Sequence, residues 1–173
     1  MPASTTFDDV SVVFRPEDLP NSLRAQAGEV WAQCGHGIFS WSVFKFYKIS
    51  LLTASGHFDS AEPYLLVLSY LRKLPAQQIV SISMQEIQRL STPSAEQLVT
   101  WRSALEQIVP DVGLGDCLIG WFQPGRGVCF FSATAELGSI LDPEFAAAFS
   151  AIWLDARTQR PALRQSLLGL ESA

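Results

Sequence analysis

The chain has 173 residues, a mass of 19.0 kDa and a formal net charge of −5. This length fits one domain, and we expect a single domain over 1–173 with its packed core at about 10–170. The Lys and Arg residues stand singly along an acidic chain, which argues against nucleic acid as a partner.

The apolar content exceeds what a minimal core needs. Hydrophobic residues make up 48% of the chain and include 11 Phe and 5 Trp. This excess favours an apolar cavity within the fold. The cysteines Cys34, Cys117 and Cys129 are odd in number and have no close pairing, so we interpret them as small core residues.

The chain contains no apolar run of the roughly 18–20 residues that a membrane span needs. Its first ten residues also lack the basic start and apolar stretch of a signal peptide. We therefore expect a cytoplasmic protein, the alternative being a periplasmic protein whose leader has been removed.

The first third of the chain has β character. Four segments are rich in strand-forming residues: Val10 to Phe14, Glu29 to Cys34, Ser40 to Leu52, and Tyr64 to Tyr70. Gly35-His36-Gly37 predicts a turn between the second and third segments. Lys45 interrupts the alternation of the third, so either a bulge shifts its register or both of its faces are covered.

The middle of the chain is helical. Apolar residues recur every three or four positions in Pro75 to Leu90, at Val80, Met84, Ile87 and Leu90. Thr92 and Pro93 predict the cap and first residue of a second helix, which ends before Pro110. Its apolar stripe is Leu98, Trp101, Leu105 and Ile108.

The last third returns to strands and then to helices. Cys117 to Phe122 and Val128 to Phe131 flank Gln123-Pro124-Gly125-Arg126, which predicts a hairpin with a type II turn. Glu136 to Ile140 predicts a third strand. Asp142-Pro143 begins a helix that buries Phe145, Phe149 and Ile152, and Pro161 begins another with Leu163, Leu167 and Leu170. Blocks of strands and helices predict an α+β fold with an antiparallel sheet.

Searches for catalytic and cofactor motifs find no complete set. Gly35, Gly37 and Ser40 do not form a dinucleotide fingerprint, and no phosphate-binding Gly-Lys-Ser or Gly-Lys-Thr loop is present. His36 lacks an orienting third residue and is read as a solvent-facing turn residue. Cys34 and His36 lack the further ligands of a zinc site. We expect neither a cofactor nor a metal.

Several segments together resemble the bacterial chalcone-isomerase-like proteins. The segments that carry the resemblance are Gly35-His36-Gly37-Ile38-Phe39-Ser40-Trp41, Lys45-Phe46-Tyr47, Tyr70-Leu71-Arg72, Pro124-Gly125-Arg126-Gly127, Ile152-Trp153-Leu154-Asp155-Ala156-Arg157-Thr158, and Leu167-Leu168-Gly169. They follow in order from about Glu29 to Leu170.

This resemblance implies an open-faced β-sandwich, in which a large antiparallel sheet is covered by a layer of helices above a ligand cleft. Plant enzymes of this fold cyclise chalcones with an Arg that holds an anionic oxygen, assisted by Thr, Tyr and Asn. Non-catalytic members bind fatty acids through a basic residue and a Tyr.

The chain departs from the family where the chemistry is expected. Ser40 stands at the position of the Arg, and the Tyr and Asn positions fall near Ala76 or Gln77 and on Ser83. The Thr position falls near Lys48. Because a Ser hydroxyl cannot replace a guanidinium charge, chalcone cyclisation is disfavoured.

We therefore favour a non-catalytic module that binds a small apolar or amphipathic molecule such as a fatty acid. Its candidate ligand-binding residues are Ser40, Trp41, Tyr47, Lys48, Arg72 and Trp101. The ordinary alternative places Trp41 and Trp101 in the core and bonds the Tyr47 hydroxyl to backbone. Two further functions stay open: an isomerase or intramolecular lyase that uses Tyr47 with Lys48 or Arg72, and a structural or partner-binding module. Arg157 and Arg160 are read as exposed loop residues or carbonyl caps.

Overall fold

The computed structural model describes residues 15–170, and within them six strands form one antiparallel sheet. Each strand pairs with its neighbour in sequence, in the order β1-β2-β3-β4-β5-β6. The strands are β1 (Ala32–Trp41), β2 (Phe44–Thr53), β3 (Tyr64–Tyr70), β4 (Cys117–Gln123), β5 (Gly127–Phe131) and β6 (Glu136–Ile140). The expected antiparallel α+β architecture is confirmed, while the segment Val10 to Phe14 lies outside the described residues.

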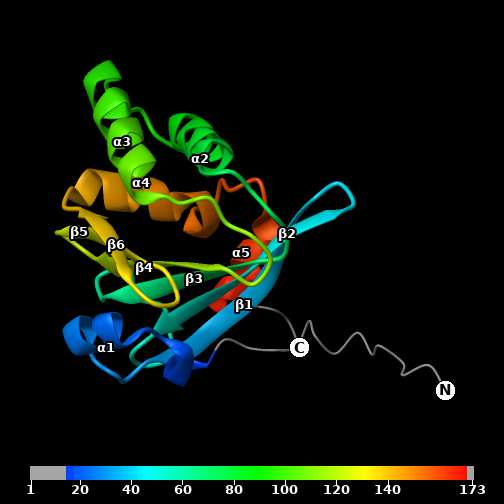
Figure 1. Cartoon of the computed structure of the whole chain (residues 1–173), viewed down its shortest axis with the longest axis vertical. Helices are drawn as coiled ribbons and strands as arrows, with labels where there is room; N and C mark the ends of the chain where they lie inside the picture. Colours follow the sequence, from blue (N-terminus) through cyan, green and yellow to red (C-terminus); the bar gives the residue numbers. More distant parts are fainter. Residues whose placement is uncertain (1–14, 171–173) are drawn as a thin grey trace.

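One face of the sheet is covered by four helices (Figure 1). They are α2 (Ala76–Leu90), α3 (Ala95–Ile108), α4 (Pro143–Leu154) and α5 (Pro161–Leu168). Helix α4 packs on β5 and lies between the sheet and α2, whereas α3 packs on α2 and reaches β6, and α5 packs across β1. Alternation along the strands turns residues such as Ile49, Leu51 and Leu66 toward these helices, where they form the main core.

The opposite face is covered in part by α1 (Asn21–Ala27), a short helix that the sequence pattern does not predict. Leu23 is its one buried residue, so it lacks the repeated apolar stripe that identifies the other helices. Leu23 joins a second apolar cluster with Leu52 and Leu65, which alternate away from the main core. Both faces of the sheet are therefore covered where α1 packs against it.

The β1–β2 hairpin differs from the expected arrangement. Gly35-His36-Gly37 is not a turn but lies inside the continuous strand β1, and the chain reverses at Ser42 and Val43. The bulge that Lys45 suggested is present, because the pairs Phe39–Tyr47 and Ser40–Lys45 leave Phe46 as an extra residue. His36 is exposed as expected, although on a strand.

The two glycines allow β1 to approach α5 closely. A Cβ atom at Gly35 would lie 1.9 Å from the carbonyl oxygen of Ser166, and one at Gly37 would lie 2.4 Å from Leu163 Cδ1. The glycine signal in the sequence therefore reflects close contact with α5, with its backbone at Gly35 and with its side chains at Gly37, rather than a turn.

The other elements follow the sequence pattern closely. Helix α2 buries the four residues predicted for it, and the β4–β5 turn has Gly125 at φ 78°, as a type II turn requires. Helix α3 begins two residues later than expected, since its cap is Ser94 and its first residue Ala95 in place of Thr92 and Pro93, and Ser94 forms a capping box with Gln97. Leu170 is 61% exposed rather than part of the α5 stripe.

Cys34 and Cys117 are half-buried and Cys129 is buried, all as free thiols, and burial raises the pKa of each.

Over residues 15–170, the helices are all too short or too polar to cross a membrane.

Replacing Gly35 by Ala should destabilise the fold, because the added methyl group meets the backbone of α5 and the helix must move away. We expect a loss of about 3 kcal/mol or more in the free energy of unfolding, measured by urea denaturation. Gly113→Ala is the matched control, since its Cβ would find only Asp116 Oδ2 at 3.8 Å. Equal stability of the two variants would contradict the close packing of α5 on β1.

Candidate ligand-binding site

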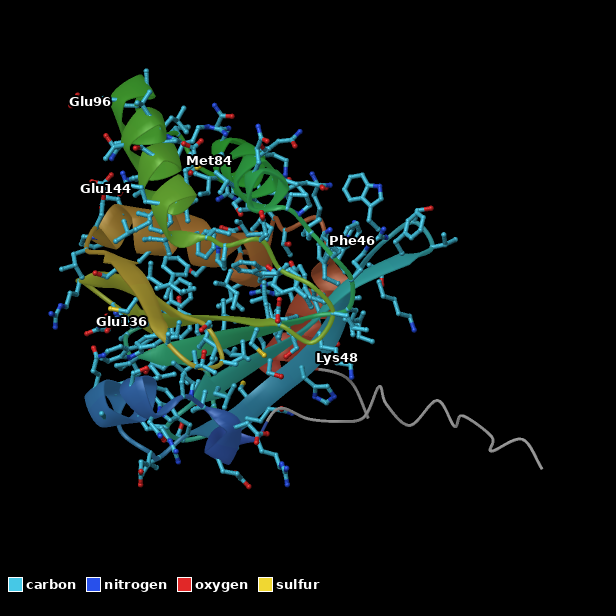
Figure 2. All side chains as sticks on the ribbon, in the orientation of Figure 1. Phe46, Lys48, Met84, Glu96, Glu136 and Glu144 are labelled. Carbon is cyan, nitrogen blue, oxygen red and sulfur yellow. The ribbon has the colours of Figure 1, made fainter. Side chains whose placement is uncertain are left out.

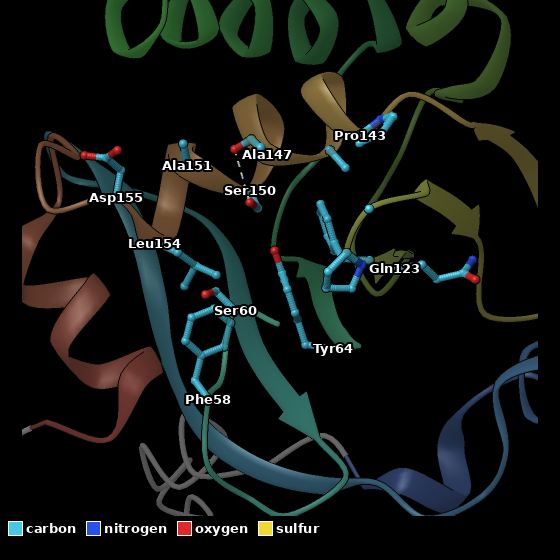
Figure 3. A pocket seen from close by; sticks show the side chains of 14 residues that line it. Phe58, Ser60, Tyr64, Gln123, Pro143, Ala147, Ser150, Ala151, Leu154 and Asp155 are labelled. Atoms are coloured by element: carbon cyan, nitrogen blue, oxygen red, sulfur yellow. Dashed lines mark hydrogen bonds between the residues drawn. The ribbon is translucent and has the colours of Figure 1, made fainter. Parts of the chain in front are cut away.

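A pocket of about 410 Å³ lies between α4, the loop before β3 and the β4–β5 turn (Figure 3). Its lining is mostly apolar and comes from segments far apart in the sequence. The lining residues are Phe58, Ser60, Tyr64, Phe122, Gln123, Pro124, Gly125, Pro143, Ala146, Ala147, Ser150, Ala151, Leu154 and Asp155.

The sequence of α4 explains why space remains beside it. Phe145, Phe149 and Trp153 recur every four residues and pack in the core. The small residues Ala147 and Ser150 face the pocket between these turns. The large side chains on one face of α4 therefore anchor the helix in the core, while the small side chains on the adjacent face leave the pocket unfilled.

Aromatic rings form the wall opposite α4. The Tyr64 ring stacks on Phe122 with centroids 4.9 Å apart, and Phe58 meets Tyr64 edge-on at 5.1 Å. Phe122 in turn stacks toward Phe149 at 6.2 Å, so this wall is continuous with the core. Such a wall is apolar and pre-formed, which is typical of small-molecule pockets.

The polar groups of the pocket are few. The Tyr64 hydroxyl faces Ser150 (Figure 3), and burial raises the Tyr64 pKa, so the phenol stays protonated at neutral pH. The Ser150 hydroxyl also donates to the carbonyl of Ala147 at 3.3 Å. The hydrogen bonds that Asp155 accepts from Arg157 lower the Asp155 pKa and keep that carboxylate charged. No Lys or Arg stands among the described residues that line the pocket.

None of the six sequence-predicted site residues lines this pocket. Tyr47 lies in the core instead, stacked on Phe39 with ring centroids 4.9 Å apart. Its hydroxyl accepts a hydrogen bond from Trp153 Nε1 at 2.9 Å, rather than bonding to backbone. Burial raises the Tyr47 pKa far above its usual range, so Tyr47 cannot serve as a general base at neutral pH.

Trp101 is also a core residue and is distant from Tyr47. Its Nε1 donates to Asp142 Oδ2 at 2.9 Å, at the start of α4, whereas Tyr47 is bonded at the end of that helix. The two ends are about 16 Å apart along the helix axis. The two residues that sequence reasoning placed in one cleft therefore anchor opposite ends of α4.

The remaining predicted residues surround the β1–β2 hairpin. Ser40 is half-buried opposite Lys45, and Trp41 is 58% exposed at the hairpin end. Arg72 is exposed, with its guanidinium carbon 4.6 Å from the Phe44 ring centroid. Lys48, further along β2 (Figure 2), follows Tyr47 and so points away from the main core. Their role in ligand binding stays a prediction.

The structure brings a cation to this hairpin that sequence reasoning did not place there. Arg160 is half-buried, with its guanidinium carbon 5.1 Å from the Phe39 centroid and 5.4 Å from that of Trp41. Arg157, by contrast, caps a carbonyl as expected, since its Nη2 donates to the Leu90 oxygen at 2.8 Å. Arg160 is thus no plain loop residue, although its position near Ser40 arises only from the tertiary fold.

Within residues 15–170, no group of three His, Cys, Asp or Glu side chains is placed to hold a metal ion.

Comparisons with known proteins identify the fold but not a family. No family model matches the chain. An uncharacterized protein of Haemophilus influenzae is 26% identical over 140 residues, which are 80% of this chain and 68% of that protein. A crystal structure of a fatty-acid binding protein of Arabidopsis thaliana superposes with a TM-score of 0.65 at 11% identity, covering 90% of this chain and 95% of that one. The expected chalcone-isomerase-like fold is confirmed.

The three tyrosines of the chain should make the folded state less stable at alkaline pH. Burial raises the pKa of Tyr47, Tyr64 and Tyr70 above the 10.0 of an unfolded chain. Their stabilising contribution is complete below pH 10.0 and is lost as pH rises from there toward the folded-state pKa values, since only the unfolded chain then loses its protons. We expect the free energy of unfolding to fall by up to about 4 kcal/mol per pH unit in this range.

Urea denaturation at stepped pH measures this slope, and phenolate absorbance reports ionisation directly. Tyr70→Phe should reduce the slope by about a third, because it removes one of the three phenols. A native protein that forms phenolate at the pKa of free tyrosine would contradict the burial of these groups.

Proposed function

We propose that the chain binds a small apolar or amphipathic molecule in the pocket beside α4. The observation that carries this proposal is an apolar pocket of about 410 Å³ with an aromatic wall. Its volume falls within the range of roughly 300–1,000 Å³ that small-molecule sites occupy. The shared fold with a fatty-acid binding protein supports the same class of ligand.

The polar groups of the pocket indicate which kind of head group the ligand carries. A fatty acid carboxylate needs a cation, but the charged side chain of the lining is Asp155, whose pKa is lowered by Arg157. The hydroxyls of Tyr64 and Ser150 instead offer hydrogen bonds to an uncharged oxygen or amide. We therefore propose that an uncharged amphiphile, such as a long-chain alcohol or amide, binds more tightly than the acid of equal length.

A series of straight-chain alcohols and the matching fatty acids tests the ligand class. Affinity should rise about fourfold for each added methylene until the chain fills the pocket, since each buried methylene contributes about 0.8 kcal/mol. At a ligand concentration of about 100 times Kd, the Tm should rise by roughly 5–10 °C. Thermal shift and titration calorimetry measure these effects, and native mass spectrometry detects a ligand that copurifies.

If acids bind more tightly than alcohols of equal length, the head-group assignment is wrong, and the cations Arg72 and Arg160 become the candidates for binding the carboxylate. If neither series shifts the Tm, the binding proposal itself fails.

Filling the pocket should abolish binding without disturbing the core. Ala147 is exposed on α4 and lines the groove, so Ala147→Phe places a ring where the ligand would lie. We expect at least about a tenfold loss of affinity, equivalent to about 1.4 kcal/mol. Ala162→Phe is the matched control, because Ala162 is also exposed on a helix but does not line the pocket. Equal affinity in the two variants would place the ligand elsewhere.

A further inference from the structure

The end of the β1–β2 hairpin exposes apolar side chains close together. Trp41 is 58% exposed, Val43 85% and Phe44 51%. Among residues 15–170, the other large apolar side chains with comparable exposure, such as Val99 and Leu114, stand apart from one another in the sequence. We call Trp41, Val43 and Phe44 the hairpin tip.

The hairpin tip projects from the body of the protein. The pair Trp41 and Phe44 closes the hairpin, and the chain reverses through Ser42, whose φ of 56° is left-handed. Figure 1 shows this end extending past the helical layer, and Figure 2 places Phe46 at its base. The tip is thus accessible to a surface that approaches it end-on.

Three cations flank the tip. The guanidinium of Arg160 lies over the Trp41 ring at 5.4 Å, and that of Arg72 lies over the Phe44 ring at 4.6 Å. Lys45 is exposed beside them, opposite Ser40. In the part of the chain that the structure describes, Arg72, Arg160 and Lys45 form no ion pair with a carboxylate. Guanidinium groups stacked on aromatic rings keep the N–H groups at their open edges available for anionic oxygens, although Nε of Arg160 is buried.

The charge around the tip is opposite to that of the whole chain. The net charge is −5, yet 30–58, which includes the hairpin, contains no Asp or Glu. The segments 63–85 and 156–170, which supply Arg72 and Arg160, are free of acidic residues as well. The three segments that supply the tip and its cations therefore carry no acidic residue, and the acidic residues bonded beside them are Asp111 and Asp116, on the segment that pairs with Tyr70 and Leu74.

We propose that the hairpin tip is a contact site for an anionic lipid surface. Trp41, Val43 and Phe44 enter the headgroup region, where amphipathic aromatic rings are favoured, and the three cations meet the lipid phosphates. The tip exposes on the order of 400 Å², about half of what each partner buries in a stable protein interface. A convex tip of this size fits a fluid surface better than a second protein. The proposal does not depend on the pocket beside α4.

Vesicle flotation tests the proposal with the full chain. We expect binding to vesicles of phosphatidylcholine mixed with phosphatidylglycerol, with much weaker binding to phosphatidylcholine alone, and weakening with added salt. The double variant Val43→Ser/Phe44→Ser should lose at least about tenfold in affinity for the anionic vesicles. Val99→Ser/Leu114→Ser removes equally exposed apolar groups elsewhere and should bind like the wild type.

Two further measurements separate the contribution of the positive charges from that of the apolar side chains. Lys45→Glu reverses a charge without removing apolar surface, and we expect it to weaken anionic binding by about tenfold or more. The blue shift of tryptophan fluorescence on vesicle binding should disappear in Trp41→Phe, since that indole is the one placed at the tip. These variants alter exposed residues, and thermal unfolding verifies that each is folded.

Failure of the wild type to bind anionic vesicles would overturn the proposal. So would equal loss in the tip variant and its control. Dimers of the wild type that form without lipid and dissociate in Val43→Ser/Phe44→Ser would assign the tip to a second copy of the chain, and would also overturn it.

Discussion

The fold depends on the contact between α4 and the sheet. Phe145, Phe149 and Trp153 enter the core from successive turns of the helix, and the hydrogen bond from Trp153 to Tyr47 fixes its far end. At the near end, Asp142 caps the helix and accepts a hydrogen bond from Trp101 of α3. Because α4 is held at both ends and along one face, its neighbouring face can carry small side chains, and the pocket exists on that face.

The same contact involves residues at the position where the resemblance predicts the ligand cleft. The resemblance implies an Arg at the position where this chain has Ser40. The neighbouring space holds Phe39 stacked on Tyr47, with Trp153 behind them. Burial of the Tyr47 phenol then raises its pKa, so the group is suited to packing rather than to proton transfer. Arg160 reaches this region from the last loop, where it stacks on rings at the surface of the hairpin.

Sequence patterns predicted the elements whose signals are local. The α2 stripe, the Pro124-Gly125 turn and the Asp142-Pro143 helix start all depend on residues within a few positions of one another. The patterns failed in two places, for different reasons. Glycine can serve either a turn or a close approach, and in β1 it allows the approach of α5. Helix α1 has only one buried residue, so its sequence shows no apolar period.

The candidate site could not be predicted in the same way. The α4 pocket combines side chains from segments as distant as Phe58 and Asp155, and its opening results from alanines that have no chemical signature. Arg160 and the hairpin aromatic rings likewise meet only through the fold. Sequence reasoning could name the aromatic and basic residues of the chain, but their grouping required the tertiary structure.

The strand order also determines how the chain can fold. Neighbours in the sheet are neighbours in sequence, so β1 to β3 and β4 to β6 each assemble by short connections. The exception is the β3–β4 pair, which is separated by residues 71–116 with α2 and α3 between them. Closing that segment costs about 3 kcal/mol more conformational entropy than closing a two-residue turn. The folding barrier should therefore lie at the joining of two preformed half-sheets, and the packing of α2 on α4 and of α3 on β6 contributes free energy that offsets the entropic cost.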